Sequence, residues 1–337
     1  MSVMGKLIKV IMVLTLLWGG WWAIATAGLK SAGTTWFDAR RAEGWQADVG
    51  SIEESGFPLR LQTRLTHIAL ADPETGTAVR MDQFDVSTPA YWPGYVTVTL
   101  PDTPITLASP GLRATLTAQD AQADLRLRPD TTLPLESMVL TGGEWKVDTA
   151  AGDLLGADTI AISMIQQTAE APIYDFQIDA TGLTPGTLPR GFLGLPADWP
   201  LAFDTFTGSM TVGFDTVWDR RALEQRRPQP RSIDLERAQF VWGAVEMLAT
   251  GNVTVDEAGL ATGTISLKAE NWPAMLEMAE TSGYLARNVR PQAEQMLGAL
   301  AQMSGQTTGL DLTISLQDGR MSMGFIPLGS APRIVLR

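Results

Sequence analysis

The sequence predicts a mainly β protein: a β-rich α+β fold in which an N-terminal transmembrane helix precedes an extended, curved antiparallel sheet with a few covering helices. Two patterns carry this prediction. One is an uncharged apolar run near the N-terminus, and the other is an alternation of apolar and polar residues along much of the remaining chain. The 337 residues leave about 300 outside the helix, enough for one large domain or two smaller ones.

The apolar run extends from Val10 to Leu29, with Lys6 and Lys9 before it and Lys30 after it. A helix rises about 1.5 Å per residue, so roughly 20 apolar residues cross a hydrocarbon core about 30 Å thick. Lysines before a span favour a cytoplasmic N-terminus. The sequence therefore predicts a single-pass protein of the inner membrane, held by Val10–Leu29, with the bulk of the chain in the periplasm.

Trp18, Trp21 and Trp22 suit the outer membrane interface, where amphipathic indoles gather. The alternative is a secretory signal cleaved after Ala25-Thr26-Ala27, before Gly28, because this stretch has the small-x-small form of a cleavage site. The apolar run is longer than the 7–15-residue core of typical signals, which favours a retained anchor. Export is common to both readings.

The helical spacing continues beyond the span as far as Gly44, which suits a helix stop with Trp45 as the hydrophobic contact after it. We therefore assign residues 1–44 to the cytoplasmic start, the transmembrane helix and its extension.

Strict alternation of apolar and polar residues predicts antiparallel strands with one face exposed to solvent. Turn-forming residues between these segments favour hairpins, as in Asp72–Gly76 and Asp318-Gly319. The alternating segments are Leu59–Leu65, Val96–Leu100, Leu112–Leu116, Ala123–Leu127, Tyr174–Ile178, Leu310–Leu316 and Met321–Phe325.

A Gly- and Pro-rich stretch, residues 181–200, is predicted to link an N-terminal antiparallel β region, 45–180, to a C-terminal α+β region, 201–337. Short helices are expected within residues 184–196 and 219–228. A longer one is expected from Pro273 to about Ser304, broken or kinked at Pro291. Its methionine-rich face either covers the sheet or forms the lid of an apolar pocket; it comprises Met275, Met278, Ala279, Leu285, Val289, Met296 and Leu300.

The predicted strands offer more apolar surface than so few helices can cover. Either the sheet closes on itself around a core, or part of its apolar face remains as a groove that accepts acyl chains. The inward positions that would line such a groove are Leu61, Val98, Leu116, Leu125 and Phe176.

A cluster of arginines is the one positive concentration in a chain of net charge −12. With Trp218 beside it, it could grip anionic head groups or a partner's carboxylates. Asp219, Glu224 and Glu236 lie among these arginines, so a solvated segment without a ligand is the alternative. The cluster comprises Arg220, Arg221, Arg226, Arg227 and Arg231.

Composition argues against several chemistries. The chain has no cysteine and one histidine, His67, which we expect to be a plain surface or strand-end residue. The paired acids lie at turns, and none forms a calcium loop. The net negative charge opposes nucleic acid binding. We therefore expect no metal, no cofactor and no enzymatic activity. The alternative left open is a hydrolase such as a glycosidase, whose two carboxylates would come from distant segments.

Two stretches carry a resemblance, residues 40–76 and 318–337. They contain the motifs Gly56–Arg60, at the start of the β body, and Gly324–Pro332, near the C-terminus. With these motifs, they resemble the two ends of proteins of the DUF2125 family, which is alphaproteobacterial. The layout is also distantly similar to AsmA-like envelope proteins, whose curved sheets offer apolar grooves to lipids. The resemblance implies a family and an envelope compartment, with no established activity. The surplus of apolar strand faces leaves two functions open: a protein that binds or conducts a lipid or another lipophilic ligand, or a structural module that contacts other envelope proteins and has a closed, sandwich-like core.

Overall fold

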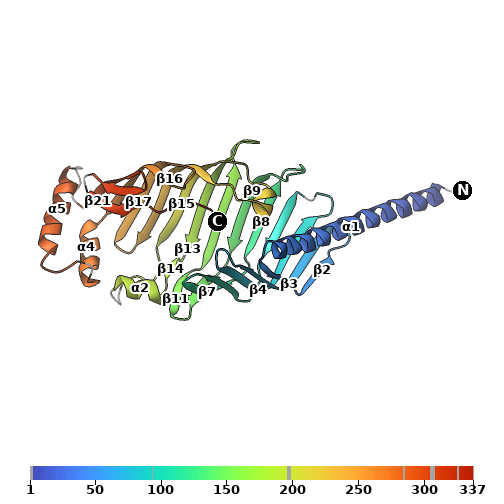
Figure 1. The fold of residues 1–337 in the computed structure, drawn as a ribbon, viewed down its shortest axis with the longest axis horizontal. Helices are drawn as coiled ribbons and strands as arrows, with labels where there is room; N and C mark the ends of the chain where they lie inside the picture. Colours follow the sequence, from blue (N-terminus) through green and yellow to red (C-terminus); the bar gives the residue numbers. More distant parts are fainter. Residues whose placement is uncertain are drawn as a thin grey trace. The chain divides into compact units, whose positions relative to one another are not determined.

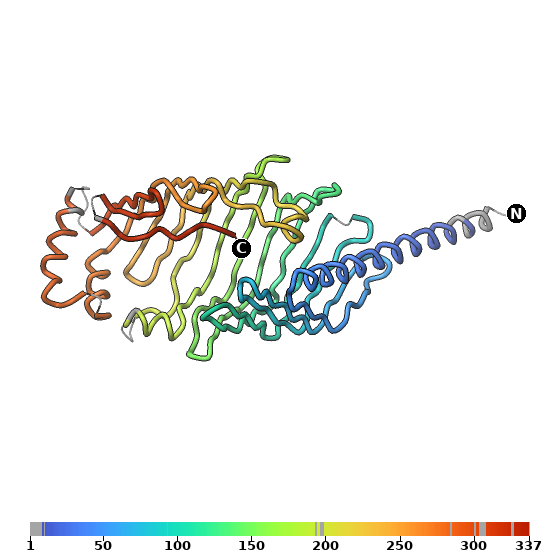
Figure 2. The backbone as a smooth tube through the Cα atoms, in the orientation of Figure 1, coloured from blue at the N-terminus to red at the C-terminus, as the bar shows by residue number. Residues whose placement is uncertain are grey.

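The computed structural model describes residues 3–92, 94–195, 199–283, 285–303, 308–324 and 326–336 (Figures 1 and 2). Strands account for 50% of the chain and helices for 21%, which confirms the mainly β prediction and its long N-terminal apolar helix. The predictions for Ser304 and Phe325, and for the side chain of Leu300, fall outside the described residues.

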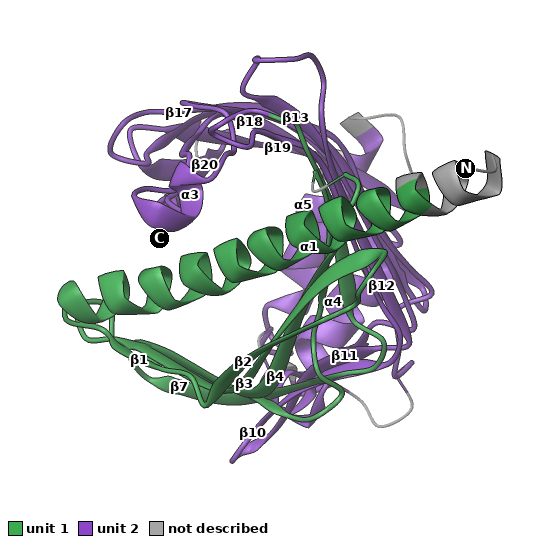
Figure 3. Cartoon of the chain, turned by 90° about the vertical axis from the view of Figure 1, so that its right-hand side faces the viewer, with its two compact units in different colours: residues 1–129 green, residues 130–337 purple. Residues whose placement is uncertain are grey.

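The chain divides into two compact units, Met1–Pro129 and Asp130–Arg337 (Figure 3). The first contains the long helix and eight strands, and the second contains the remaining strands and the short helices. The predicted linker, residues 181–200, lies inside the second unit.

In the first unit, β3 and β4 form a long antiparallel hairpin at the centre of the sheet. Both β1 and β2 pair with β3, while β4 pairs with β5 near one end and with β6 near the other. β5 then pairs with β8, and β6 with β7. The elements are α1 (Val3–Ala42), β1 (Gln46–Asp48), β2 (Ser51–Ser55), β3 (Arg60–Asp72), β4 (Thr77–Pro89), β5 (Tyr95–Thr99), β6 (Ile105–Ser109), β7 (Leu112–Ala118) and β8 (Gln122–Leu127).

The end of α1 is formed as the sequence predicts. Gly44 adopts a left-handed conformation with φ 92°, and the backbone N–H of Trp45 donates to the carbonyl of Arg40 at 3.0 Å. Such a cap satisfies a carbonyl that the helix leaves free.

The C-terminal part of α1 covers the apolar face of the first unit's sheet. Phe37 from the helix packs with Ala47 of β1 and Ile68 of β3, and all three are buried. Half-buried side chains complete this cluster: Trp36, Val49, Leu65, Leu70, Met81 and Phe84. The helix therefore runs along the sheet and shields its apolar face from water.

His67 shifts the apolar alternation of β3 by one residue. It is exposed in mid-strand with a left-handed φ of 51°. Leu65 before it and Ile68 after it both face α1, although a regular strand would place them on opposite faces. Pairing with β4 keeps the same register on both sides of His67. This histidine therefore has a structural role within the strand that its sequence context did not indicate.

In the second unit, ten strands form one antiparallel sheet in the order β9, β12, β13, β15, β16, β17, β18, β19, β20, β21. The sheet is curved (Figure 3). These strands are β9 (Leu135–Gly142), β12 (Thr159–Gln166), β13 (Ile173–Thr181), β15 (Thr205–Phe214), β16 (Pro230–Trp242), β17 (Val245–Val255), β18 (Ala261–Glu270), β19 (Gly309–Gln317), β20 (Arg320–Met323) and β21 (Ile326–Ser330).

The predicted linker is a packed connection between neighbouring strands. β13 before it pairs directly with β15 after it, so the sheet continues across the stretch. The connection contains α2 (Thr187–Leu193) and β14 (Thr184–Pro185), which pairs with β11 (Gly152–Ala157); β11 in turn pairs with β10 (Trp145–Thr149). The Arg190 guanidinium donates to the carbonyls of Trp199 and Pro200.

The predicted long helix is two helices, α4 (Trp272–Thr281) and α5 (Arg290–Met303). The break precedes Pro291, which lies in the first turn of α5, where its missing N–H costs nothing. The helix in residues 219–228 is only the single turn α3 (Arg221–Glu224).

Truncating Phe37 should destabilise the protein, because it leaves a cavity between α1 and the sheet. We expect Phe37→Ala to cost about 3–5 kcal/mol. Phe192, whose exposure is 79% against 4% for Phe37, provides a matched control, since Phe192→Ala removes little buried surface. Thermal unfolding of the full chain in detergent, followed by circular dichroism, measures both. Equal melting temperatures for the two variants would contradict this packing.

Candidate functional site

One face of the second unit's sheet is apolar from strand to strand. Antiparallel register aligns apolar residues in rows that cross the strands. One row contains Leu140, Ile162, Ile178, Gly208, Ala238, Ala249, Leu267 and Leu312. The next contains Met138, Met164, Phe176, Met210, Leu235, Gly251, Ile265, Ile314 and Met323. The opposite face carries mostly polar residues such as Gln177 and Thr264.

One end of this apolar face is covered by α4 and α5. Trp272 and Leu276 of α4 and Ala301 of α5 form a buried cluster with Ala269 and Leu310 of the sheet. Of the predicted methionine-rich face, Met275 and Leu285 pack against this cluster, whereas Val289 and Met296 are exposed. The break before Pro291 explains this, because it interrupts the helical spacing on which the predicted face was based.

The other end is covered by the C-terminal segment, residues 331–336. Its Ala331 and Ile334 pack on a buried cluster that includes Val253 and Leu316. The Ile334 N–H donates to the Gly259 carbonyl at 2.9 Å, in the turn between β17 and β18. The C-terminal segment therefore crosses the strand ends.

Between the two covered ends, the rows remain half-buried, and a hollow of about 230 Å³ opens over β13, β15 and β16. Gly208 and Ala238 face each other across β15 and β16 and leave room between larger side chains. The apolar side chains that line the hollow are Phe176, Ile178, Phe206, Met210, Leu235, Ala238 and Phe240.

A bulge in β16 lies beneath this hollow. Leu235 pairs with Gly251 and Ala238 with Ala249, so two residues of β16 stand where one would fit a regular ladder. Glu236 is exposed within the bulge. The extra residue keeps both Leu235 and Ala238 on the apolar face, and bulges of this kind bend a strand.

Of the predicted groove residues, Phe176 lies in the hollow. The other four lie on the sheet of the first unit, where Leu61 is buried and Val98, Leu116 and Leu125 are half-buried. The hollow residues that the prediction missed belong mainly to β15 and β16. The alternation in residues 205–214 could have indicated Phe206 and Met210, but the glycine at 208 interrupts the apolar pattern.

Most of the predicted arginine patch is paired with nearby acceptors. Arg220 pairs with Glu224 at 3.0 Å, and Arg221 donates to Asp219 at 2.9 Å. This hydrogen bond raises the pKa of Arg221.

The remaining paired arginines converge on Asp215. Arg226 contacts its carboxylate at 2.7 Å and Arg231 at 3.6 Å, and Arg231 also donates to the Asp256 carbonyl. Arg227 is exposed and has no ion pair within the described chain. The patch therefore presents less free positive charge than its sequence indicates.

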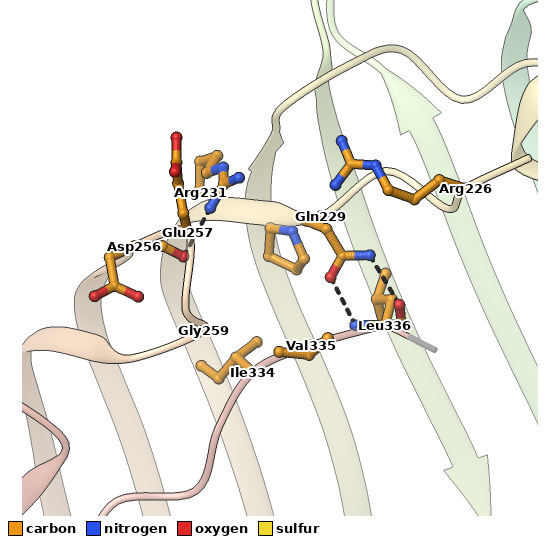
Figure 4. A pocket seen from close by; sticks show the side chains of 10 residues that line it. Arg226, Gln229, Arg231, Asp256, Glu257, Gly259, Ile334, Val335 and Leu336 are labelled. Atoms are coloured by element: carbon orange, nitrogen blue, oxygen red, sulfur yellow. Dashed lines mark hydrogen bonds between the residues drawn. The ribbon is translucent and has the colours of Figure 1, made fainter. Parts of the chain in front are cut away.

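Arg226 and Arg231 border a second hollow, of about 280 Å³, beside the C-terminal segment (Figure 4). The Gln229 amide donates to the Leu336 carbonyl at 2.8 Å and accepts from the Leu336 N–H at 3.0 Å. Asp256 and Glu257 also line this hollow. Charges of both signs meet here, so the arrangement does not favour an anion.

Asp215 connects the arginines to the C-terminal segment. Burial acts to raise its pKa, but the hydrogen bond from the Gln229 backbone N–H and the pairing with Arg226 and Arg231 outweigh burial, so the pKa of Asp215 is lowered. Gln229 in turn binds Leu336. The ionised form of Asp215 therefore supports the contact of Gln229, just before β16, with the C-terminal segment.

Among the residues that the structure describes, no three His, Asp or Glu side chains are grouped so that they could hold a metal ion. His67 is exposed on β3 in the first unit. The main feature of the described surface is thus the apolar face of the second unit's sheet, which has charged groups at its rim.

The family model described as "Uncharacterized protein conserved in bacteria (DUF2125)" matches residues 22–332. The chain belongs to the DUF2125 family. A search of curated protein sequences found no match. The match covers both units of this DUF2125 protein and confirms the resemblance of its two end segments.

Removing the charge of Asp215 should loosen the C-terminal segment of this DUF2125 protein. A carboxylate whose pKa is lowered by folding contributes stability above its unfolded pKa, and the contribution is lost as pH falls through the folded value. We therefore expect Asp215→Asn to lower the melting temperature at pH 7 and to reduce the loss of stability between about pH 5 and pH 2.

Asp179→Asn, on the exposed polar face of β13, serves as the control for this charge change. Melting curves across that pH range measure both variants. An Asp215→Asn variant with the pH dependence of the original protein would show that the predicted role of this carboxylate is wrong.

Proposed function

We propose that this protein is a membrane-anchored protein of the cell envelope that holds a lipid, or another long lipophilic molecule, on the apolar face of its second unit. The observation that carries the proposal is the half-buried middle of that face with its apolar hollow. Both ends of the face are covered by the protein's own segments, whereas most side chains of the rows between them are only half-buried.

Anchoring rests on α1. The helix over Ile11–Ala42 is long and apolar enough to span a membrane, and Leu14, Leu16 and Leu17 are each more than half exposed. Side chains of this kind are stable in lipid rather than in water. The lysines that precede the span support a cytoplasmic N-terminus and a periplasmic folded part.

The lining of the hollow favours an acyl chain over a polar ligand. Thr207, Ser209 and Gln239 contribute to its wall, but they alternate with the apolar residues, so their side chains belong to the opposite face of the sheet. The walls therefore recognise shape and apolarity. At about 230 Å³, the hollow is smaller than pockets that enclose a whole ligand, which begin at roughly 300 Å³; it suits part of a chain lying along the face.

A ligand-free structural module is the competing function, because the same alternation would serve a closed core. The two functions differ in whether lipid reaches the middle of the face in the membrane-bound protein. A photoactivatable phospholipid, with its reactive group on the acyl chain, tests this in membranes that contain the full chain. Adducts on peptides from β13 to β18 indicate binding, while adducts on α1 are expected in either case.

Placing a carboxylate in the hollow should prevent lipid binding. We expect Phe176→Glu to lower the adduct yield on β13 to β18 at least about fivefold, because the ligand would have to desolvate a charge. The adduct yield on α1 should not change. Mass spectrometry of the digested protein measures both yields in one sample.

Gln177→Glu is the matched control, since it adds the same charge on the polar face of the same strand. It should leave both yields unchanged. If Phe176→Glu unfolds the protein, as judged by circular dichroism, the face is a closed core and the ligand-free module is favoured. A folded Phe176→Glu variant with full adduct yield would contradict lipid binding at the hollow.

Filling the hollow without charge provides a second test. A Cβ built on Gly208 would have only the Arg237 carbonyl nearby, at 3.9 Å, and Gly208 has no positive φ. We therefore expect Gly208→Leu to keep or raise the melting temperature while it lowers the adduct yield on β13 to β18 several-fold. An unchanged yield would mean that lipid does not enter at this point.

A further inference from the structure

Three tryptophans of α1 are hydrogen-bonded to loops of the first unit. The indole N–H of Trp18 donates to the Pro58 carbonyl and that of Trp22 to the Arg60 carbonyl, both at 2.8 Å. The indole N–H of Trp21 donates to the Ala90 carbonyl at 3.2 Å. Pro58 lies in the β2–β3 connection, Arg60 is the first residue of β3, and Ala90 begins the β4–β5 connection. Both loops are therefore fixed to the aromatic segment of the predicted span.

The same loops expose large apolar side chains. Phe57 is 56% exposed, Leu59 66% and Tyr91 70%, and Trp92 is also exposed. The ring of Phe57 meets Trp22 edge to face, with 5.4 Å between centroids. Single exposed apolar residues are ordinary, but a group of them beside a candidate membrane span indicates a surface that contacts lipid.

We propose that Phe57–Leu59 and Tyr91–Trp92 form a membrane-contacting surface, the loop collar, at the boundary between head groups and acyl chains. It lies in the leaflet that faces the folded domain. The loop collar rests on the proposed anchoring by α1. It adds that the folded domain itself touches the bilayer, through the connections at the start of β3 and at the end of β4.

The length of α1 supports this depth. From Val3 to Trp22 the helix rises about 28 Å at 1.5 Å per residue, close to the roughly 30 Å of a hydrocarbon core. Such a span holds Lys6 and Lys9 near its cytoplasmic end, where long lysine side chains can reach the head groups. Tryptophans at that level fall at the interface, where their rings are half in lipid. If the span were Val10–Leu29 instead, the loop collar would lie about 10 Å deeper in the hydrocarbon.

Charge and hydrogen bonding favour the interfacial depth. Arg60 follows Leu59 directly and is exposed, and the Arg126 guanidinium lies over the ring of Tyr95 at 5.0 Å. Arginines are costly in hydrocarbon but suit the head-group region. The indole donors also satisfy loop carbonyls that would have few water molecules near them at this depth.

The absence of cysteine from the sequence makes single-cysteine labelling a direct test. Leu59→Cys and Tyr91→Cys are labelled with an environment-sensitive fluorophore in the full chain. The protein is reconstituted in phosphatidylcholine and phosphatidylglycerol vesicles that carry a lipid spin label either near the head group or deep in the acyl chain. We expect the shallow quencher to remove at least half of the fluorescence at both positions, and the deep quencher to remove less.

Two control variants give reference values for quenching outside the membrane and within the span. Glu74→Cys lies in the β3–β4 turn, at the far end of the 13-residue strand β3, about 40 Å away, and should be quenched by neither label. Leu14→Cys, within the span, should be quenched most by the deep label.

Other quenching patterns would contradict the loop collar, the anchor or the interfacial depth separately. Quenching at Leu14→Cys without quenching at Leu59→Cys and Tyr91→Cys would overturn the loop collar and leave the anchor in place. Absence of quenching at Leu14→Cys would overturn the anchor itself. Stronger quenching of the loop probes by the deep label would overturn the interfacial depth and favour the Val10–Leu29 span.

Discussion

The strict alternation of apolar and polar residues along antiparallel strands is the constraint on which both units depend. Because neighbouring strands keep their register, the alternation of single strands adds up to a whole face that must be removed from water. The first unit meets this requirement with α1, whose Phe37 is buried against β1 and β3. The second unit meets it at the strand ends, where two short helices and the C-terminal segment pack and where Trp218 packs on Phe214.

The sequence predicted those features that depend on local pattern. The strands, the one-sided face and the end of α1 at Gly44 follow from residue periodicity and from the conformational freedom of glycine. Phe176, which the same pattern placed on the inward face, lies in the hollow. Features that depend on a break in the pattern could not be read this way. His67 resets the alternation in mid-strand, and nothing in its neighbours indicates that a non-glycine residue adopts a positive φ there.

The hollow and the ion pairs of the arginine patch could not be predicted from the sequence for a different physical reason. The hollow exists because Gly208 and Ala238 are cross-strand partners, and pairing between strands about 30 residues apart is a tertiary property. The free charge of the arginine patch depends on carboxylates such as Asp215, which lies outside the arginine run but faces it. The Gly- and Pro-rich stretch looked like a linker because composition does not reveal that the strands on either side of it pair.

The number of strands in the second unit sets the reach of its apolar face. The row from Met138 to Met323 crosses nine strands, and strands lie about 4.8 Å apart, so the row is about 38 Å long. The hydrocarbon part of an entire bilayer measures roughly 30 Å, and one leaflet half of that. A face of this size has room for two acyl chains placed end to end. Should lipid bind there as proposed, the number of chains bound would follow from this length, and each added hairpin would lengthen the face by two strand spacings without changing its cross-section.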